Sequence, residues 1–192
     1  LEELFETQMI EDLEKDELKD LDLLLIVHPK SLSESALYSV DQYVLSGGKL
    51  IAFVDPLAEL DLPGPGVSAI PSKSSDLNAI TRKWGVALRE QKILGDPEVA
   101  LLVGGADGRP VRHLGILGFS KEYLGQDSVV TSSIENINMA TAGIFDVDTS
   151  LETEVETLIR SSESSGLLEA YQFEYLSEPE DLQKGFSSTG ES

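Results

Sequence analysis

Two runs of consecutive apolar residues stand out in the first third of the chain. Residues 23–27 read Leu-Leu-Leu-Ile-Val, and residues 50–54 read Leu-Ile-Ala-Phe-Val. Neither run alternates with polar residues, and unbroken apolar runs of this length are typical of strands buried on both faces of a parallel sheet. The pattern therefore predicts two neighbouring parallel strands, with residues 23–27 in a central position.

The segment between these runs has the features of one helix. Its apolar positions at helical spacing are Leu37, Val40, Val44 and Leu45. Ser31 or Ser33 can cap its N-terminus, and Ser31 has capping-box spacing to Glu34. Gly47 and Gly48 end it, because glycine adopts the left-handed C-terminal position at little cost. Strand, helix and strand together predict a β-α-β unit, whose crossover is nearly always right-handed.

The next part of the chain predicts a long loop followed by a second helix. Residues 56–75 hold four prolines and two glycines, and loops of this length in compact domains are usually functional or mobile. Ser74 or Ser75 is expected to cap the helix, and Gly85 is expected to end it. The side chains expected to bury one face of this helix against the sheet are Leu77, Ile80 and Trp84.

Short strands are predicted elsewhere. Strand-like apolar content is found in residues 7–13, 86–94, 99–103, 111–114 and 153–160. A glycine-rich turn separates residues 99–103 from 111–114, which predicts a β-hairpin. For residues 7–13 an edge strand is favoured over the continuation of a helix. Leu1, Leu4 and Phe5 resemble the last turns of an amphipathic helix, so we expect the fold to begin upstream.

These elements predict one domain of the α/β class. We expect residues 1–176 to form a mainly parallel central sheet flanked by helices, with an additional β-hairpin. Residues 177–192 are rich in charged and small residues and predict a flexible tail.

Composition excludes several classes of function. The chain has 35 acidic and 14 basic residues, and its formal charge of -21 repels phosphate backbones and anionic lipid head groups. Nucleic acid is therefore not an expected partner. The absence of cysteine excludes disulfides, thiol nucleophiles and cysteine-bound metals. No apolar run approaches the roughly 20 residues that span a bilayer, so we expect no direct membrane insertion by these residues.

Polar residues follow both predicted strands at the same edge of the sheet. His28 precedes Pro29 and Asp55 precedes Pro56, and open α/β sheets bind ligands at the carboxyl ends of their strands. His28 and Asp55 either face one another as an acid–base pair or cap their turns by hydrogen bonding, and the second interpretation is favoured. Lys30 and Glu59 are the other candidate binding residues at this edge, with Lys30 placed to neutralise an anionic ligand.

No motif in the chain predicts catalysis. A G-x-S-x-G serine elbow is missing, and the second histidine, His113, falls in the predicted hairpin without a metal-binding spacing around it. The pairs Gly47-Gly48 and Gly104-Gly105 do not follow a strand and precede a helix, as a phosphate-binding loop requires. We therefore predict no metal, no cofactor and no enzymatic activity.

Several segments resemble a known family of transport proteins. The segments VHPKSLSE, LYSVDQYVLSGGK and FVDPLAE, within residues 27–59, resemble the auxiliary component of uncharacterised ABC-type transport systems. That family includes the accessory protein of a gliding-motility-associated ABC transporter. Weaker similarity extends over most of residues 20–162. It includes the segment IENINMATAG, where Asn136, Asn138 and Thr141 follow the family's pattern and are candidates for lining a groove.

The resemblance carries its own expectations. It implies an extracytoplasmic, periplasmic domain of a membrane-anchored protein, with a flavodoxin-like or class I glutamine-amidotransferase-like sheet and no known catalysis. Such amidotransferases use a catalytic cysteine, which this chain lacks. The expected partner is the ABC transporter permease or another membrane or extracytoplasmic protein, with a small-molecule ligand as a further option.

Three hypotheses for function follow from the sequence. The favoured one is a non-enzymatic binding component of an ABC-type transport system, with a role in gliding motility as one possibility. The first alternative is a small-molecule hydrolase or transferase that uses His28 and Asp55. The second alternative is a purely structural docking module, which would show no concave pocket at this edge of the sheet.

Overall fold

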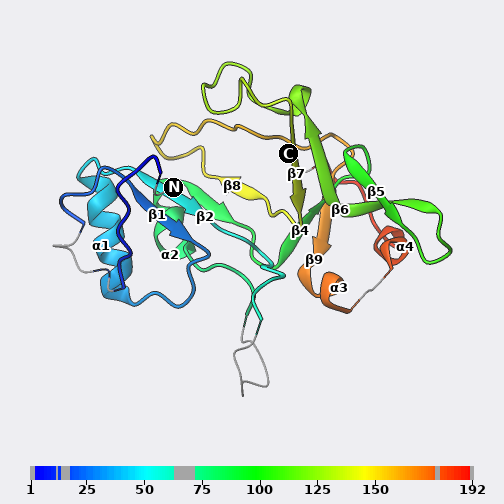
Figure 1. Cartoon of the computed structure of the whole chain (residues 1–192), viewed down its shortest axis with the longest axis horizontal. Helices are drawn as coiled ribbons and strands as arrows, with labels where there is room; N and C mark the ends of the chain where they lie inside the picture. Colours follow the sequence, from blue (N-terminus) through cyan, green and yellow to red (C-terminus); the bar gives the residue numbers. More distant parts are fainter. Residues whose placement is uncertain (1–2, 12, 14–17, 63–71, 176–177, 191–192) are drawn as a thin grey trace.

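Small sheets, rather than one large sheet, make up the fold (Figure 1). The computed structural model describes residues 3–11, 13, 18–62, 72–175 and 178–190. The strands are β1 Leu24–Val27, β2 Leu50–Phe53, β3 Val86–Leu88, β4 Lys92–Gly95, β5 Ala100–Gly104, β6 Pro110–Ser120, β7 Asn136–Ala140, β8 Phe145–Val147 and β9 Gly166–Glu169. The helices are α1 Glu34–Leu45, α2 Asn78–Thr81, α3 Ala170–Tyr175 and α4 Pro179–Gln183, with 3₁₀ turns η1 Arg82–Trp84 and η2 Lys121–Tyr123.

The predicted β-α-β unit is confirmed. β1 and β2 are parallel neighbours, with Leu24 opposite Leu50, and α1 connects them. Ser33 caps α1, since its side chain accepts a hydrogen bond from the Ala36 amide. At the other end Gly47 has a φ of 95°, and the amides of Gly47 and Gly48 donate to the last carbonyls of the helix. This is the Schellman pattern, in which glycine avoids the strain of a positive φ.

The predicted mainly parallel central sheet is wrong. Among the strands that the structure describes, β1–β2 is the single parallel pair, whereas β3–β8, β4–β9 and β5–β6–β7 are antiparallel. A flavodoxin-like or glutamine-amidotransferase-like sheet is therefore also wrong. The physical reason lies after β2. Among the described residues no further parallel pair forms, and β3 and β4 instead pair with β8 and β9, which are far away in the sequence. The predicted β-hairpin is present as β5–β6.

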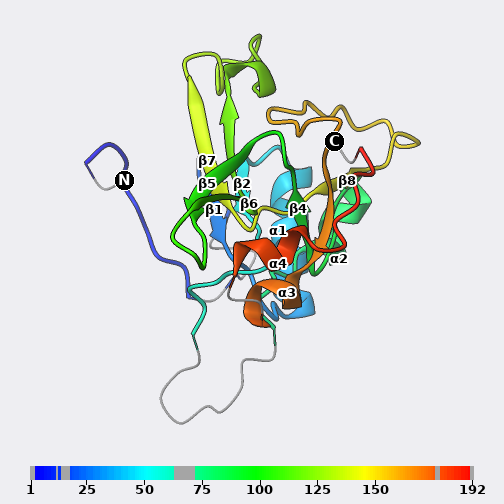
Figure 2. The same ribbon diagram turned by 90° about the vertical axis from the view of Figure 1, so that its right-hand side faces the viewer.

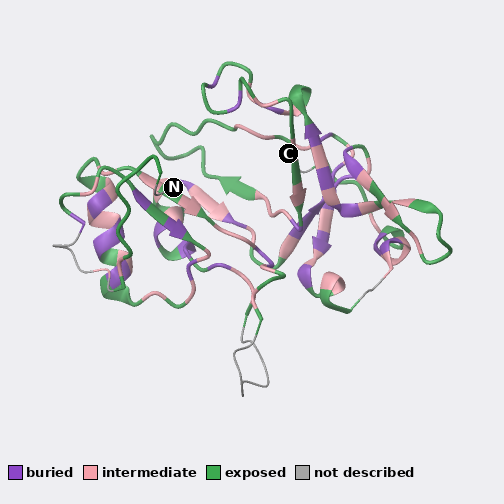
Figure 3. Ribbon diagram, in the orientation of Figure 1, coloured by how far each residue is buried: buried purple, intermediate pink, exposed green. Residues whose placement is uncertain are grey.

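The apolar runs are buried on one face only. Along β1, Leu24 and Ile26 are buried, whereas Leu25 and Val27 are exposed (Figure 3). The buried side packs against Val40 and other residues of α1 and α2 in a first hydrophobic cluster. The prediction that this strand is buried on both faces is therefore wrong, since an unbroken apolar run does not require a second covering layer.

Two lobes meet at the segment that follows β2. The N-terminal lobe consists of β1, α1, β2 and α2, and the C-terminal lobe consists of β4–β7, β9, α3 and α4. Figure 2 shows the molecule from the side of the C-terminal lobe. The C-terminal lobe holds two further hydrophobic clusters. Leu57 leaves the N-terminal lobe after Pro56 and is buried in one of them, with Ile93 and Leu168. The chain directly after β2 thus fastens one lobe to the other.

The second predicted helix is shorter than expected. Its side chains Leu77 and Ile80 are buried, and Trp84 is partly buried with its indole nitrogen donating to Asp41 Oδ1 over 3.0 Å. α2 ends at Thr81 and is followed by η1, which ends at the predicted position, Gly85, where φ is 91°. The predicted serine cap is wrong, because Leu77 is the N-cap residue and makes no side-chain cap.

Other segments also differ from the predictions. Residues 86–94 divide into β3 and β4, and residues 153–160 form only a bridge from Ile159 to Leu124. The described residues of 7–13 form no strand. Within residues 177–192, for which we predicted a flexible tail, α4 places Leu182 in the C-terminal lobe's core, where it is 2% exposed.

Candidate functional site

The carboxyl ends of β1 and β2 gather most of the candidate residues. His28 directly follows β1, and its backbone amide donates to the Phe53 carbonyl over 2.8 Å. It adopts a left-handed backbone conformation with a φ of 47°, which turns the chain sharply into Pro29. The strand exits therefore place His28 near Asp55, as the sequence predicted.

A chain of hydrogen bonds links His28 to two residues that sequence reasoning missed. Its Nδ1 lies 2.8 Å from Ser75 Oγ, and its Nε2 lies 3.4 Å from Asp61 Oδ2. Ser75 Oγ also accepts a hydrogen bond from the Asp55 amide over 2.8 Å, so its hydroxyl proton can be donated to Nδ1. Nε2 then carries the imidazole proton toward Asp61.

Lys30 is the cation of this group. Its ammonium donates to Asp61 Oδ2, the same oxygen that faces His28. The hydrogen bond from Lys30 holds the pKa of the Asp61 carboxyl below its ordinary value, and the hydrogen bond from His28 acts in the same direction. Lys30 is thus already neutralised by a carboxylate of the same chain.

The Asp55 side chain mainly stabilises the turn in which it lies. Its Oδ1 accepts a hydrogen bond from the Leu57 amide over 2.8 Å, the pattern of an Asx turn. Burial raises the pKa of the Asp55 carboxyl above its ordinary value; the Leu57 amide and His28 oppose this rise, and Glu59 adds to it. This geometry fits the favoured interpretation, in which Asp55 caps the strand exit.

Glu59 connects the edge to the C-terminal lobe. It accepts a hydrogen bond over 3.0 Å from the hydroxyl of Thr141, which directly follows β7. The Glu59 carboxylate also affects the pKa of His113, a residue of β6. Burial lowers the pKa of His113 below its ordinary value, and the negative charge of Glu59 partly opposes this decrease. Both lobes therefore contribute residues to the site. The sequence placed His113 in the hairpin, but it gave no sign that the hairpin lies near this edge.

Asn136 and Asn138 lie apart from this group. Both are exposed on β7, paired with Ser120 and Gly118 of β6. A strand advances about 3.3 Å per residue, so Asn138 is roughly 10 Å and Asn136 roughly 17 Å along the chain from Thr141. The structure does not bring either asparagine to the edge that holds His28.

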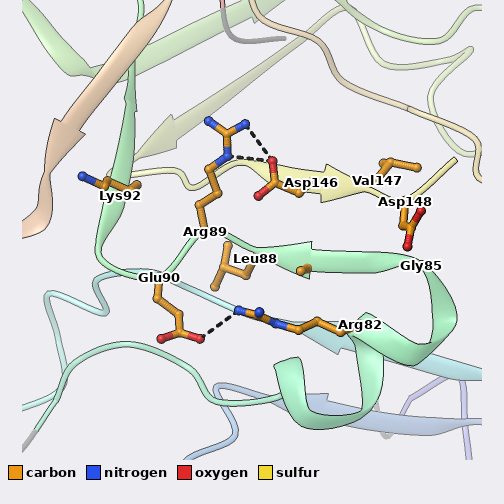
Figure 4. Close-up of a pocket in the computed structure, with 10 residues that line it drawn as sticks. Arg82, Gly85, Leu88, Arg89, Glu90, Lys92, Asp146, Val147 and Asp148 are labelled. Atoms are coloured by element: carbon orange, nitrogen blue, oxygen red, sulfur yellow. Dashed lines mark hydrogen bonds and ion pairs between the residues drawn. The ribbon is translucent and has the colours of Figure 1, made fainter. Parts of the chain in front are cut away.

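A groove with a different lining lies apart from this edge. It has a volume of about 580 Å³ and is lined by β3, β8 and their neighbours (Figure 4). Its arginines face carboxylates, with Arg89 Nη2 2.7 Å from Asp146 and Arg82 Nη2 3.5 Å from Glu90. None of its described lining residues comes from the predicted long loop, residues 56–75; residues 63–71 of that loop lie outside the described part of the chain. A smaller cavity of about 80 Å³ reaches Ser75.

The described side chains form neither a metal-binding cluster nor a membrane-spanning helix. In the part of the chain that the structure describes, no group of three or more histidine and carboxylate side chains is arranged to hold a metal ion. No helix within the described ranges has the length and apolar character needed to cross a membrane.

Comparison with known proteins identifies the family. The sequence model of the ABC-type uncharacterized transport system family matches residues 1–192, the whole of the chain. The chain belongs to this family. The resemblance found from the sequence is thereby confirmed, and the family is that of an auxiliary component of an ABC-type transport system. Comparisons with curated proteins and with solved structures gave no significant match.

The two aspartates at the edge should respond to pH in opposite ways. A carboxyl whose pKa is raised by folding destabilises the folded state once it ionises, whereas one whose pKa is lowered stabilises the fold above its ordinary pKa of 3.8. At pH 7, Asp55→Asn is expected to raise the melting temperature and Asp61→Asn to lower it. Both differences should shrink as the pH falls toward 3.

Thermal unfolding followed by circular dichroism between pH 3 and pH 7 measures both effects. The asparagine that replaces Asp55 keeps an oxygen that can accept from the Leu57 amide, so that substitution removes charge without removing the turn contact. A lower melting temperature for Asp55→Asn than for the wild type at pH 7 would contradict the raised pKa of the Asp55 carboxyl.

Proposed function

We propose that the chain is a non-enzymatic, extracytoplasmic binding component that attaches to the permease of its ABC-type transport system. Family membership supports the association with a transporter. The binding surface in this proposal is the carboxyl edge of β1 and β2, around His28, Lys30 and Glu59. A role in gliding motility stays a prediction from the resemblance.

One observation carries the non-enzymatic part of the proposal. Ser75 could act as a nucleophile only if its oxygen were accessible, yet the residue is 5% exposed and its oxygen accepts from the Asp55 amide. The series Ser75, His28, Asp61 does match the order of a hydrolase triad, which favours hydrolysis as the second candidate function. Lys30 weakens that candidate because it neutralises the carboxylate that would stabilise an imidazolium.

The charge of the edge indicates the kind of partner. Three carboxylates, Asp55, Glu59 and Asp61, stand against one ammonium, Lys30, and that ammonium is bound to Asp61. This balance disfavours the anionic ligand that we expected Lys30 to attract. It favours a segment with lysine or arginine, for which electrostatic complementarity would give orientation and a fast association rate.

Charge reversal tests the proposed edge. Glu59→Lys is expected to weaken co-purification of the full protein with the permease by tenfold or more. Because it also removes the acceptor of the Thr141 hydroxyl, its melting temperature is measured beside the binding. Glu152→Lys makes the same change of charge at another exposed position and is the matched control. Equal binding by the two variants would contradict a role for this edge.

Activity and location have separate tests. Ester or amide hydrolysis by the purified chain that is abolished by His28→Ala would overturn the non-enzymatic assignment. For location, the absence of native cysteine allows a single label at Val129→Cys, a position that is 92% exposed. A membrane-impermeant maleimide should label this cysteine in cells with an intact inner membrane; labelling only after lysis would contradict an extracytoplasmic location.

A further inference from the structure

One face of the β1–β2 sheet is covered and the other is apolar and open. Five large apolar side chains on and beside the two strands are between 42% and 64% exposed: Leu23, Leu25, Val27, Ile51 and Phe53. The opposite face, with Leu24 and Ile26, packs against α1. We call the five exposed residues the open sheet face; the exposed positions along β1 and β2 are visible in Figure 3.

The strand register makes this face continuous. Leu25 lies opposite Ile51, and Val27 lies opposite Phe53, so the exposed side chains form two adjacent rows. Parallel strands normally have both faces covered, usually by helices, because their side chains are apolar on both sides. Contiguous apolar patches on soluble proteins commonly mark sites of interaction. The open sheet face therefore has the geometry of a layer that lacks its covering helix.

Charge decides what can cover it. Exposed carboxylates stand at both ends of the strands, with Asp20 and Asp22 before β1 and Glu59 after β2. The exposed cations beside them are Lys19, which directly precedes Asp20, and Lys49, which directly precedes β2. A second copy of the chain would add another formal charge of -21, and an anionic bilayer would be repelled in the same way. A cationic partner meets no such repulsion.

We propose that the open sheet face binds an amphipathic helix of another protein, with leucine-like side chains toward the two strands and lysine or arginine along its borders. A helix about 10 Å wide can lie across two strands that are about 4.8 Å apart. Its apolar stripe covers Val27 and Phe53, and its basic borders face the carboxylates at the strand ends. The five apolar residues of the open sheet face lie outside the hydrogen-bonded edge, and Glu59 is the residue that the two surfaces share.

A designed peptide tests this surface on the intact chain. The probe is a fluorescent 18-residue helix with leucine on one face and lysine on the other, and fluorescence anisotropy measures its binding. The double variant Val27→Thr/Phe53→Thr removes apolar surface while keeping charge and β-propensity. We expect its affinity for the probe to fall at least tenfold, while its melting temperature stays close to that of the wild type.

Matched controls separate this surface from general attraction to an acidic protein. Leu102→Thr/Val129→Thr changes two apolar residues that are also exposed, at 63% and 92%, and should leave the affinity unchanged. A probe with serine in place of leucine, or with glutamate in place of lysine, should bind at least tenfold more weakly. Equal affinity of the Val27→Thr/Phe53→Thr variant and the wild type for the leucine–lysine probe would overturn the proposal.

Other occupants have distinct signatures. A concentration-dependent dimer in sedimentation equilibrium that disappears in Val27→Thr/Phe53→Thr would show that a second copy covers the face. Binding to phosphatidylglycerol vesicles that is lost in the same variant would show that a lipid surface covers it. Either result overturns the assignment of a basic helix. The assignment is supported if the protein is monomeric, does not bind the vesicles, and binds the probe through Val27 and Phe53.

Discussion

Replacement of Asp96 by alanine is expected to lower the free energy of unfolding by about 3 to 5 kcal/mol. Asp96 follows β4 and is 0% exposed. Its carboxylate accepts hydrogen bonds from the Ser162 amide at 2.7 Å, the Ser162 hydroxyl at 2.8 Å and the Glu98 amide at 3.0 Å. Alanine would leave these donors without their acceptor, and an unsatisfied buried donor costs about 1 to 3 kcal/mol.

Urea unfolding followed by circular dichroism measures this loss. Asp127→Ala removes an aspartate from an exposed position and should change stability by no more than about 0.5 kcal/mol. The stability of Asp96→Asn should lie between those of Asp96→Ala and Asp127→Ala. The asparagine side chain keeps one acceptor oxygen for a backbone N–H but lacks the second. Equal stability of Asp96→Ala and Asp127→Ala would show that Ser162 and Glu98 find other partners.

Asp96 also clarifies the role of Asp55. Both aspartates precede a proline soon after a strand, and each accepts a hydrogen bond through Oδ1 from the amide two residues later. The same Asp-Pro turn therefore forms at both of these strand exits, at Asp55 in the candidate site and at Asp96 in the interior. Its repetition supports a structural role for Asp55, so His28, Lys30 and Glu59 are the candidate binding residues that the proposal keeps at that edge.

Local sequence signals were sufficient for the β-α-β unit. The apolar run of each strand, the Ser33 cap and the Gly47 stop all act within a few residues of the element that they define. The rest of the fold depends on contacts between distant residues. β4 pairs with β9 so that Lys92 lies opposite Glu169, and such a pairing leaves no pattern within either short strand.

The candidate site was predictable to a similar extent. His28 and Asp55 were placed together because parallel strands that end in polar residues share an edge. Ser75 and Asp61 were missed because the path of the chain after β2, rather than any local motif, brings them to His28. Ser75 was expected to cap a helix, and in the structure the same hydroxyl instead accepts from the Asp55 amide.

Truncation of Leu57 is expected to destabilise the protein by about 2 to 5 kcal/mol. Its side chain is 4% exposed and packs with Ile93 and Leu168 in the C-terminal lobe, although the residue belongs to the segment that leaves β2. Leu57→Ala would open a cavity where this segment enters the C-terminal lobe. The cost depends on how far the neighbouring side chains can close that cavity, which is why the expected range is wide.

Leu60→Ala is the matched control, because Leu60 lies three residues later in the same segment and is 93% exposed. It should change stability by no more than about 0.5 kcal/mol. The backbone amide of Leu57 also donates a hydrogen bond to Asp55 Oδ1. Leu57 therefore links the turn at the candidate edge to the hydrophobic core of the C-terminal lobe. In Leu57→Ala the imidazole NMR signals of His28 should therefore shift, while those in Leu60→Ala stay in place. A stable Leu57→Ala variant with unshifted His28 signals would mean that the two lobes are joined by other contacts.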